Sequence, residues 1–197
     1  MDILISPSRL SGSISAISSK SDAHRALICA ALSDAPTELA LNGSSVDIET
    51  TIRCLQSLGA AFAVSEHGIS VSPMQSAAKT AALDCEESGS TLRFLLPVAA
   101  ALGCQANFTG RGRLPQRPVS PLKEELEAHG CRLDRALLPI ALSGQLQSGV
   151  FTLPGNVSSQ FLTGLLLCFP LLPGGGEIAL STALESAGYV EMTIQTM

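Results

Sequence analysis

The chain has 197 residues, of which 46% are apolar and 15% charged, and its formal net charge is −5. This composition is typical of a globular protein with a buried core, and the negative net charge argues against a general nucleic-acid binder. The longest apolar stretch, residues 161–172, is interrupted by Thr163, Gly164 and Pro170, so no membrane span is expected. The N-terminus lacks the pattern of a signal peptide, and we therefore expect a cytoplasmic protein.

The first part of the chain predicts a unit of alternating helices and strands. Apolar side chains on all sides of a helix predict that it is buried, and apolar residues that recur every 3.6 residues predict an amphipathic helix. Alternating polar and apolar residues predict a strand. The expected elements are a buried helix at 25–32 after an opening at Ser21, a strand at 37–41, an amphipathic helix at 47–58, and strands at 62–64 and 69–71 joined by Glu66-His67-Gly68.

The same order of elements recurs in the rest of the chain. The second unit predicts helices at 92–102 and 120–129, a strand at 105–109 and a strand pair within 132–142. The third unit predicts a helix at 161–172, a strand at 177–181 and a helix at 189–197. Internal repetition of this kind predicts one supersecondary unit used several times.

The repeat divides the chain into units of about 14–80, 81–147 and 148–197. By comparison with the first two, the third unit lacks about 15 to 20 residues for its closing strands. We therefore expect the chain to be a fragment whose third unit is truncated. Residues 1–13 have no counterpart in the repeat and predict an initial strand that belongs with absent structure.

Each unit opens its first helix with a cluster of hydroxyl side chains. Ser21, Ser90 and Ser159 occupy equivalent positions at a 69-residue interval. The first N–H groups of a helix have no intrahelical partner and lie at the positive end of its dipole, so these openings suit phosphates and carboxylates. Half of the 12 Lys and Arg residues lie in or just after the first two openings. The pattern indicates a site for small anionic ligands.

The six cysteines and three histidines do not form a disulfide framework or a metal motif. The sequence has no C-x-x-C pair, and most cysteines have apolar neighbours, as expected of buried free thiols. The histidines are too far apart for a spaced set of metal ligands. We expect no metal site.

Five ordered motifs resemble the 5-enolpyruvylshikimate-3-phosphate synthase family. They cover nearly the whole chain and only the N-terminal half of such an enzyme. The motifs are Lys20-Ser21 with Arg25, Ser88-Gly89-Ser90-Thr91-Leu92-Arg93, Leu114-Pro115-Gln116-Arg117-Pro118-Val119, Val157-Ser158-Ser159-Gln160-Phe161, and Glu185-Ser186 with Tyr189-Val190-Glu191-Met192-Thr193-Ile194.

The resemblance implies an α/β fold, an inverse αβ-barrel-like domain of three βαβαββ units around buried helices, with the third unit truncated. The domain would span residues 14–197, and residues 1–13 would belong with the missing C-terminal partner domain. The implied reaction transfers the enolpyruvyl group of phosphoenolpyruvate to the 5-hydroxyl of shikimate 3-phosphate, without metal or organic cofactor. The implied partners are these two anionic substrates and the missing domain.

The resemblance also implies which residues bind each substrate. Those expected at shikimate 3-phosphate are Lys20, Ser21, Arg25, Ser158, Ser159, Gln160, Ser186 and Tyr189. Those expected at phosphoenolpyruvate are Lys20, Gly89, Arg117 and Gln160. Lys20 is also the catalytic candidate, because a lysine between two phosphorylated substrates can neutralise charge and exchange a proton with the enol. Arg93 and Asp47 are secondary candidates, the latter as a group that orients Lys20 or a water.

Each of these residues also has a purely structural interpretation. The serines and Asp47 could serve only as helix caps. Tyr189 could pack in the core, Arg117 could be a solvated loop residue, and Arg93 could brace the adjacent loop. The sequence alone leaves these alternatives open.

Three positions depart from the usual pattern of the family. Glu87 stands where asparagine is common, Phe94 replaces a frequent proline, and Ala187-Gly188 replaces a basic residue and proline. The departures bear on substrate affinity and inhibitor sensitivity. Gly89 is retained, which in this family goes with sensitivity to glyphosate-type mimics of phosphoenolpyruvate.

Two other functions are compatible with parts of the pattern. The related UDP-N-acetylglucosamine enolpyruvyl transferase would need a reactive cysteine in the loop that here reads Leu114-Pro115-Gln116-Arg117. A noncatalytic repeat scaffold would explain the periodicity but not the cations and hydroxyls at the helix starts. If the resemblance holds, a half-length chain should have negligible turnover alone.

Overall fold

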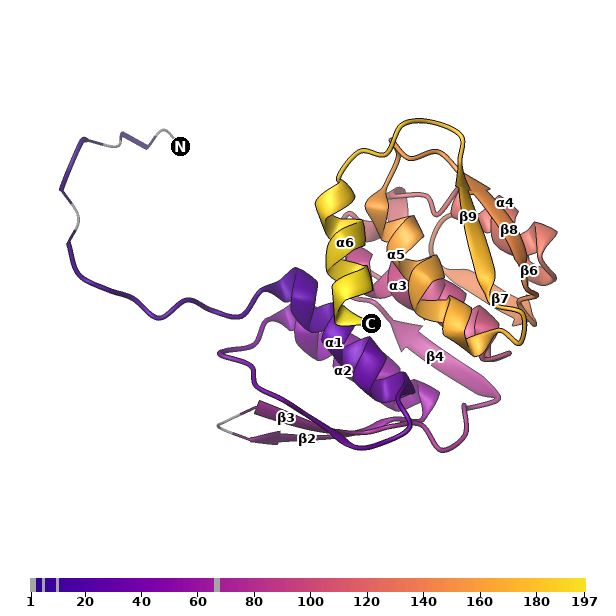
Figure 1. Ribbon diagram of the computed structural model, residues 1–197, viewed down its shortest axis with the longest axis horizontal. Coiled ribbons are helices and arrows are strands. Elements are labelled where there is room, and N and C mark those ends of the chain that lie inside the picture. Colours follow the sequence, from indigo (N-terminus) through magenta and orange to yellow (C-terminus); the bar gives the residue numbers. More distant parts are fainter. Residues whose placement is uncertain (1–2, 5, 10, 66–67) are drawn as a thin grey trace.

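The computed structural model describes residues 3–4, 6–9, 11–65 and 68–197. The described residues before Ser18 are extended and exposed, without helix or strand, and run away from the body of the domain (Figure 1). The initial strand expected in residues 1–13 is therefore absent from the described part of that segment. Its place in a partner domain stays a prediction. The turn expected at Glu66-His67 lies outside the described residues.

The strands form three separate sheets. The first has the order β1-β3-β2 and is antiparallel, with β1 at Thr37–Leu39, β2 at Ala61–Ser65 and β3 at Gly68–Ser72. The second has the order β4-β5-β7-β6, from Thr80–Asp84, Gln105–Thr109, Ile140–Gly144 and Cys131–Leu133, and only its β4–β5 pair is parallel. The third is the parallel pair of β8, Gly149–Leu153, and β9, Gly176–Leu180.

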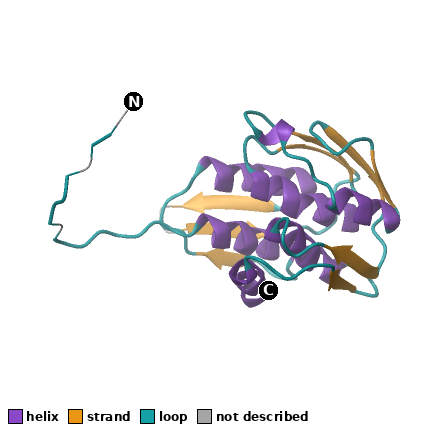
Figure 2. Cartoon of the chain, turned by 90° about the horizontal axis from the view of Figure 1, so that it is seen from above, coloured by secondary structure: helices purple, strands orange, loops and turns teal. Residues whose placement is uncertain are grey.

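The helices lie between these sheets, as Figure 2 shows from above. They are α1 (Lys20–Leu32), α2 (Val46–Leu58), α3 (Gly89–Ala101), α4 (Leu122–Ala128), α5 (Ser159–Cys168) and α6 (Ala187–Thr196), with short 3₁₀ helices η1 (Leu114–Gln116) and η2 (Phe169–Leu171). α3 is the most deeply placed, because every residue from Thr91 to Ala101 is buried. The helices that begin with serine clusters thus form the centre of the domain.

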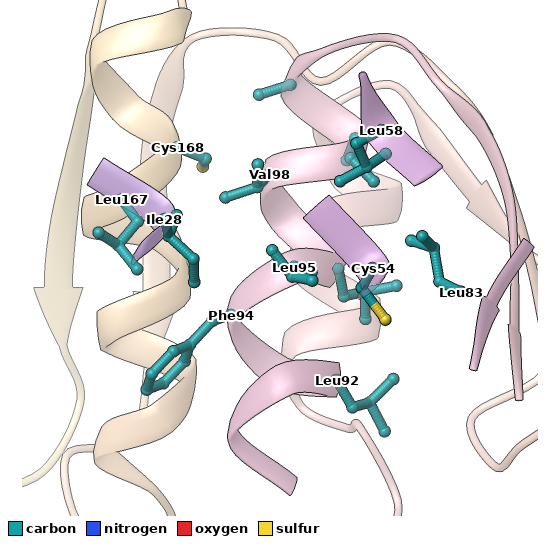
Figure 3. Packing of buried hydrophobic residues seen from close by; sticks show 14 of the residues in the cluster. Ile28, Cys54, Leu58, Leu83, Leu92, Phe94, Leu95, Val98, Leu167 and Cys168 are labelled. Carbon is teal, nitrogen blue, oxygen red and sulfur yellow. The ribbon is translucent and has the colours of Figure 1, made fainter. Parts of the chain in front are cut away.

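α3 and α5 pack closely because of two residues that usually disfavour helices. Pro97 lies inside α3 and has no N–H for the carbonyl of Arg93 four residues earlier. Gly164 of α5 faces this point, where an added Cβ would lie 2.8 Å from Pro97 Cγ. The buried Phe94 and Val98 point from α3 toward α5, whereas Leu92 points to the other side of α3 (Figure 3). This packing brings the N-terminal ends of α3 and α5 together.

The structure confirms the mixed α/β class and most of the predicted elements. Residues 80–144 follow the order β4, α3, β5, α4, β6, β7, which is one complete βαβαββ unit. The helix predicted at 161–172 is shorter, since α5 ends at Cys168 and η2 follows around Pro170. Strands β4 and β8 were not predicted individually. All six cysteines are free thiols.

None of the described helices is long and apolar enough to cross a membrane.

Candidate anion-binding site

A pocket of about 440 Å³ lies where the N-terminal ends of α1, α3, α5 and α6 meet. All eight residues predicted for shikimate 3-phosphate line it, and so does Arg117. The complete lining is Lys20, Ser21, Arg25, Ser90, Phe94, Arg117, Val157, Ser158, Ser159, Gln160, Ser186 and Tyr189. Residues far apart in the sequence therefore meet at one surface.

Three of the four helices present capped first turns to the pocket. Ser19 Oγ accepts from the Asp22 N–H, Ser88 Oγ from the Thr91 N–H, and Ser158 Oγ from the Gln160 N–H. Capping and pocket lining are thus combined in Ser158, whereas Ser21, Ser90 and Ser159 lie within the helices that follow the caps. Their hydroxyls are added to the free N–H groups of those turns, which is the arrangement that suits a phosphate.

Lys20 reaches the pocket from the first turn of α1 and pairs with Asp47 of α2. Its Nζ donates to Asp47 Oδ2 at 2.7 Å, and its side chain is 52% exposed. Asp47 therefore fixes the ammonium group at the pocket wall without burying it. This contact is the one expected if Asp47 orients Lys20.

Arg25 is 2% exposed and joins three helices. Its Nε donates to Thr193 Oγ1 at 2.8 Å, its Nη1 to the Ser21 carbonyl at 2.5 Å, and its Nη2 to Thr163 Oγ1 at 3.0 Å and the Tyr189 carbonyl at 3.1 Å. A guanidinium has five N–H donors, so one remains for a ligand. Burial lowers the pKa of Arg25 from its usual value, against the opposing effect of Asp22. Arg25 thus has a structural role as well as a place at the pocket.

Gly89 lies between two arginines at the start of α3. A Cβ on Gly89 would lie 2.9 Å from Arg117 Nη1 and 3.0 Å from Arg93 Nη1. Arg93 is buried and donates to the carbonyls of Gly89 and Pro118, so it braces the loop, as the structural alternative for this residue supposed. Burial, followed by repulsion from Arg117, lowers the pKa of Arg93 to about 10. Arg117 is exposed and lines the pocket.

These cations have no acidic partners in the part of the chain that the structure describes. The ion pairs found there involve Lys20, Arg53, Arg111, Lys123 and Arg135, and none involves Arg25, Arg93 or Arg117. Two guanidinium groups that line the pocket, those of Arg25 and Arg117, thus have no ion-pair partner among the described residues, which favours an anionic ligand.

Gln160 links the starts of α5 and α3. Its Nε2 donates to Ser90 Oγ at 3.0 Å, while its Oε1 is buried and has no hydrogen-bond partner among the described residues. Ser90 was not predicted as a site residue, although its equivalence to Ser21 and Ser159 was visible in the sequence. Phe94 and Val157 were also not predicted as site residues, although Val157 begins one of the family motifs and Phe94 is a departure from the family pattern.

α6 closes one side of the pocket with Ser186 and Tyr189. Ser186 has a left-handed backbone with φ 56°, which directs the chain into the helix. Tyr189 is 47% exposed, so it does not pack in the core and its ring is accessible at the pocket.

The departures from the family pattern lie mostly outside the pocket lining. Glu87 is exposed and its carboxylate lies beside Gly112, while Phe94 lines the pocket and packs against the Arg25 guanidinium 5.1 Å from its ring centre. Ala187 and Gly188 do not line it. Phe94 is thus the substitution that changes the pocket wall itself.

Helix N-termini, hydroxyls and cations around one pocket of an α/β domain are an arrangement that suits small anions. The sequence profile of EPSP synthase (3-phosphoshikimate 1-carboxyvinyltransferase) matches residues 5–197. The chain belongs to the EPSP synthase family.

Two curated relatives are similar over essentially the whole chain. The 3-phosphoshikimate 1-carboxyvinyltransferase of Clostridium kluyveri is 39% identical over 198 residues, which cover 99% of this chain and 46% of that protein. The protein of the same name from Clostridium beijerinckii is 38% identical, covering 100% of this chain and 47% of that protein. The chain thus spans about half the length of the curated relatives it matches.

Solved structures support the fold. EPSP synthase from Acinetobacter baumannii matches with a TM-score of 0.77 and 19% identity, over 93% of this chain and 42% of that one. The enolpyruvyl transferase NikO from Streptomyces tendae matches with a TM-score of 0.55 and 17% identity, over 89% of this chain and 42% of that one. At these identities the likeness concerns the fold alone.

Proposed function

We propose that this chain forms the shikimate-3-phosphate half of an enolpyruvyl transferase site. The proposed reaction joins the 5-oxygen of shikimate 3-phosphate to carbon 2 of phosphoenolpyruvate. The bond between that carbon and the phosphate oxygen breaks, and phosphate leaves with the hydroxyl proton. The product, 5-enolpyruvylshikimate 3-phosphate, belongs to the shikimate pathway of aromatic amino acid biosynthesis.

One observation carries this proposal. Every residue that the family motifs assign to shikimate 3-phosphate lines a single pocket, although the residues come from three widely separated segments. Helix caps alone would not require the first turns of α1, α5 and α6 to converge. The convergence gives the cations and hydroxyls at the helix starts a common purpose, which a noncatalytic repeat scaffold does not.

In this proposal the phosphate of shikimate 3-phosphate lies at the first turn of α5. Ser158 and Ser159 supply hydroxyls there, at the positive end of the helix dipole. The remaining N–H of Arg25 and the unpartnered Oε1 of Gln160 would hold hydroxyls of the ring. Tyr189 provides the accessible ring face that covers the sugar.

Phosphoenolpyruvate would lie toward Gly89. Arg117 can bind its carboxylate or phosphate with two parallel N–H groups, and the absent side chain of Gly89 leaves Arg117 free to adopt that position. Lys20 lies between the two substrates, where it would neutralise charge and exchange a proton with the enol. The resemblance implies that the remaining acids, bases and cations come from a partner domain, so we expect negligible turnover by this chain alone.

Calorimetric titration with shikimate 3-phosphate tests the half-site. We expect saturable binding that weakens about tenfold or more in Ser159→Ala and in Lys20→Ala, because each removes a donor to a charged oxygen. Arg25→Ala is less informative, since Arg25 also holds α1, α5 and α6 together.

Ser181→Ala serves as the matched control, because Ser181 is exposed and does not line the pocket. It should bind like the unaltered chain. Equal affinity in all of these variants would contradict the proposed site, and loss of folding without loss of affinity in the folded fraction would favour the scaffold.

A further inference from the structure

His24 is completely buried next to Arg25 and Phe94, which line the pocket, but it does not line the pocket itself. It lies on α1 immediately before Arg25. Its Nδ1 lies 2.7 Å from Thr51 Oγ1 of α2, and its ring meets Phe94 of α3 edge to face, with centres 6.2 Å apart. His24 thus contacts α2, which carries Asp47, the partner of Lys20, and α3, which begins at Gly89.

A continuous line of short hydrogen bonds runs from His24 to the cap of α3. Thr51 Oγ1 lies 2.7 Å from Thr91 Oγ1, and Thr91 Oγ1 donates to Ser88 Oγ at 2.7 Å. All four side chains are buried. We call this set, His24, Thr51, Thr91 and Ser88, the His24 relay.

Proton counting gives the relay a direction. Each hydroxyl has one proton, and the proton of Thr91 is used on Ser88. The bond between Thr91 and Thr51 must then use the proton of Thr51, and the bond between Thr51 and His24 must use a proton on Nδ1. A longer contact of 3.2 Å joins Thr51 Oγ1 to the Asp47 carbonyl and competes only weakly.

The ring of His24 is neutral at physiological pH, because burial, partly opposed by Asp47, lowers its pKa to about 4. A neutral imidazole has one N–H, so Nε2 has none when Nδ1 is protonated. Nε2 has no hydrogen-bond partner among the described residues, so no contact at Nε2 competes with the one at Nδ1. A hydrogen bond at Nδ1 is therefore the polar contact that fixes the ring.

We propose that His24 is a positioning residue, which acts through Thr51 and Thr91 to hold Ser88 and so places the first N–H groups of α3 at Gly89 and Ser90. The proposal rests on the proposed function, in which phosphoenolpyruvate binds at Gly89. It adds a physical link between α1, which carries Lys20 and Arg25, and the start of α3. The relay then resists movement of α1 relative to the start of α3.

The tautomer can be measured directly on the full chain with ¹⁵N-labelled histidine. At pH 7 we expect the His24 Nδ1 resonance of a protonated nitrogen and the strongly deshielded Nε2 resonance of an unprotonated one. This arm needs no variant and no ligand. A ring protonated at Nε2, with that N–H directed at Phe94, would overturn the proposal.

Two variants of His24 separate positioning from filling space. In Asn, the amide nitrogen is as many bonds from Cα as Nδ1 of histidine, so His24→Asn should keep the donor to Thr51. In Gln the nitrogen lies one bond further, so His24→Gln should not. We expect the amide resonances of Gly89 and Ser90 to stay near their original positions in His24→Asn and to shift in His24→Gln.

Thr51→Val breaks the relay while keeping the side-chain shape, and provides the same readout if His24→Gln does not fold. It should shift the Gly89 and Ser90 amides, and unshifted amides would overturn the proposal. Equal behaviour of the Asn and Gln variants would also overturn it. In the presence of shikimate 3-phosphate, we expect phosphoenolpyruvate affinity to fall about tenfold in Thr51→Val and to be retained in His24→Asn.

The ligand arm and the spectroscopic arms can fail separately. If the unaltered chain binds neither substrate, the proposed function fails, while the tautomer and the amide shifts still decide whether the relay exists. If the chain binds both substrates and Thr51→Val binds them equally well, the relay does not position the site.

Discussion

The residue with the sharpest steric constraint at the pocket is Gly89. We predict that Gly89→Ala displaces the Arg117 guanidinium, because the new methyl group would lie 2.9 Å from its Nη1, while the buried Arg93 on the other side is held by two carbonyls. In the presence of shikimate 3-phosphate, affinity for phosphoenolpyruvate should fall about tenfold or more. Calorimetry with both ligands measures this.

Gly188→Ala is the matched control for that substitution. It also lies in the first turn of a helix, and a Cβ there meets nothing within 4 Å. Urea unfolding checks that both variants stay folded, and Gly188→Ala should be at least as stable as the unaltered chain, since alanine is the better helix former. Unchanged phosphoenolpyruvate affinity in Gly89→Ala would rule out the proposed contact.

His24 makes stability depend on pH in a definite direction. Its pKa falls from 6.5 to about 4 on folding, mainly through burial, with Asp47 opposing and Lys20 and Arg25 assisting. Between these values the unfolded chain binds the extra proton, so stability should decrease as the pH falls from 6.5 to 4, by about 3 kcal/mol. The loss is absent above pH 6.5.

His24→Asn removes this titration while keeping the donor at Thr51. Urea unfolding of both proteins between pH 7 and pH 4 isolates the contribution of His24, because the carboxylates titrate in both. As the pH falls, the unaltered chain should lose more free energy of unfolding than His24→Asn does. Parallel curves would show that the histidine titrates normally in the folded state.

At the scale of elements, the caps of the central helices differ in how much they support. Ser88 is buried and accepts from both the N–H and the hydroxyl of Thr91, whereas Ser19 is exposed and accepts from the Asp22 N–H alone among the described residues. Ser88→Ala should therefore cost about 2 kcal/mol of unfolding free energy, and Ser19→Ala about 0.5 kcal/mol. Urea unfolding at pH 7 compares them, and equal losses would contradict this ranking.

α6 contacts the domain through the polar contacts of Thr193 and through Val190, which packs against the core. Thr193 is its one fully buried residue and bonds with Arg25 and Thr163. Thr193→Val should raise amide hydrogen exchange across α6 about tenfold, because two buried partners lose a bond. Thr196→Val on the same helix should have little effect. The Thr196 hydroxyl donates to the Met192 carbonyl within α6, and its contact with Asp22 Oδ1 is long, at 3.4 Å.

The sequence predicted the helices better than the strands. Apolar residues nearly all round predicted the burial of the helix at 25–32, which lies within α1, whereas β4 and β8 were not named because short strands depend on partners elsewhere, Gln105–Thr109 and Gly176–Leu180. α5 ends before the predicted residue 172 because Pro170 has no N–H with which to continue the hydrogen bonds of the helix. Local pattern predicts the type of an element more reliably than its pairing or its end.

At the scale of the molecule, the motifs predicted which residues meet but not how they are supported. Ser90 could have been predicted from its register with Ser21 and Ser159. The partners of Arg25 could not, because Thr163 and Thr193 lie 138 and 168 residues away and threonine gives no signal of its own. The His24 relay likewise joins residues of three helices that only the folded packing brings together.

The central claim is that the N-terminal ends of α1, α3, α5 and α6 form one site for a phosphorylated ring. The most direct test is a calorimetric titration of the unaltered chain with shikimate 3-phosphate and, separately, with shikimate. The account predicts saturable binding of the phosphate ester and at least about tenfold weaker binding of shikimate, because the α5 donors would lose their charged partner. Equal affinity for the two compounds, or no binding of either, would contradict it.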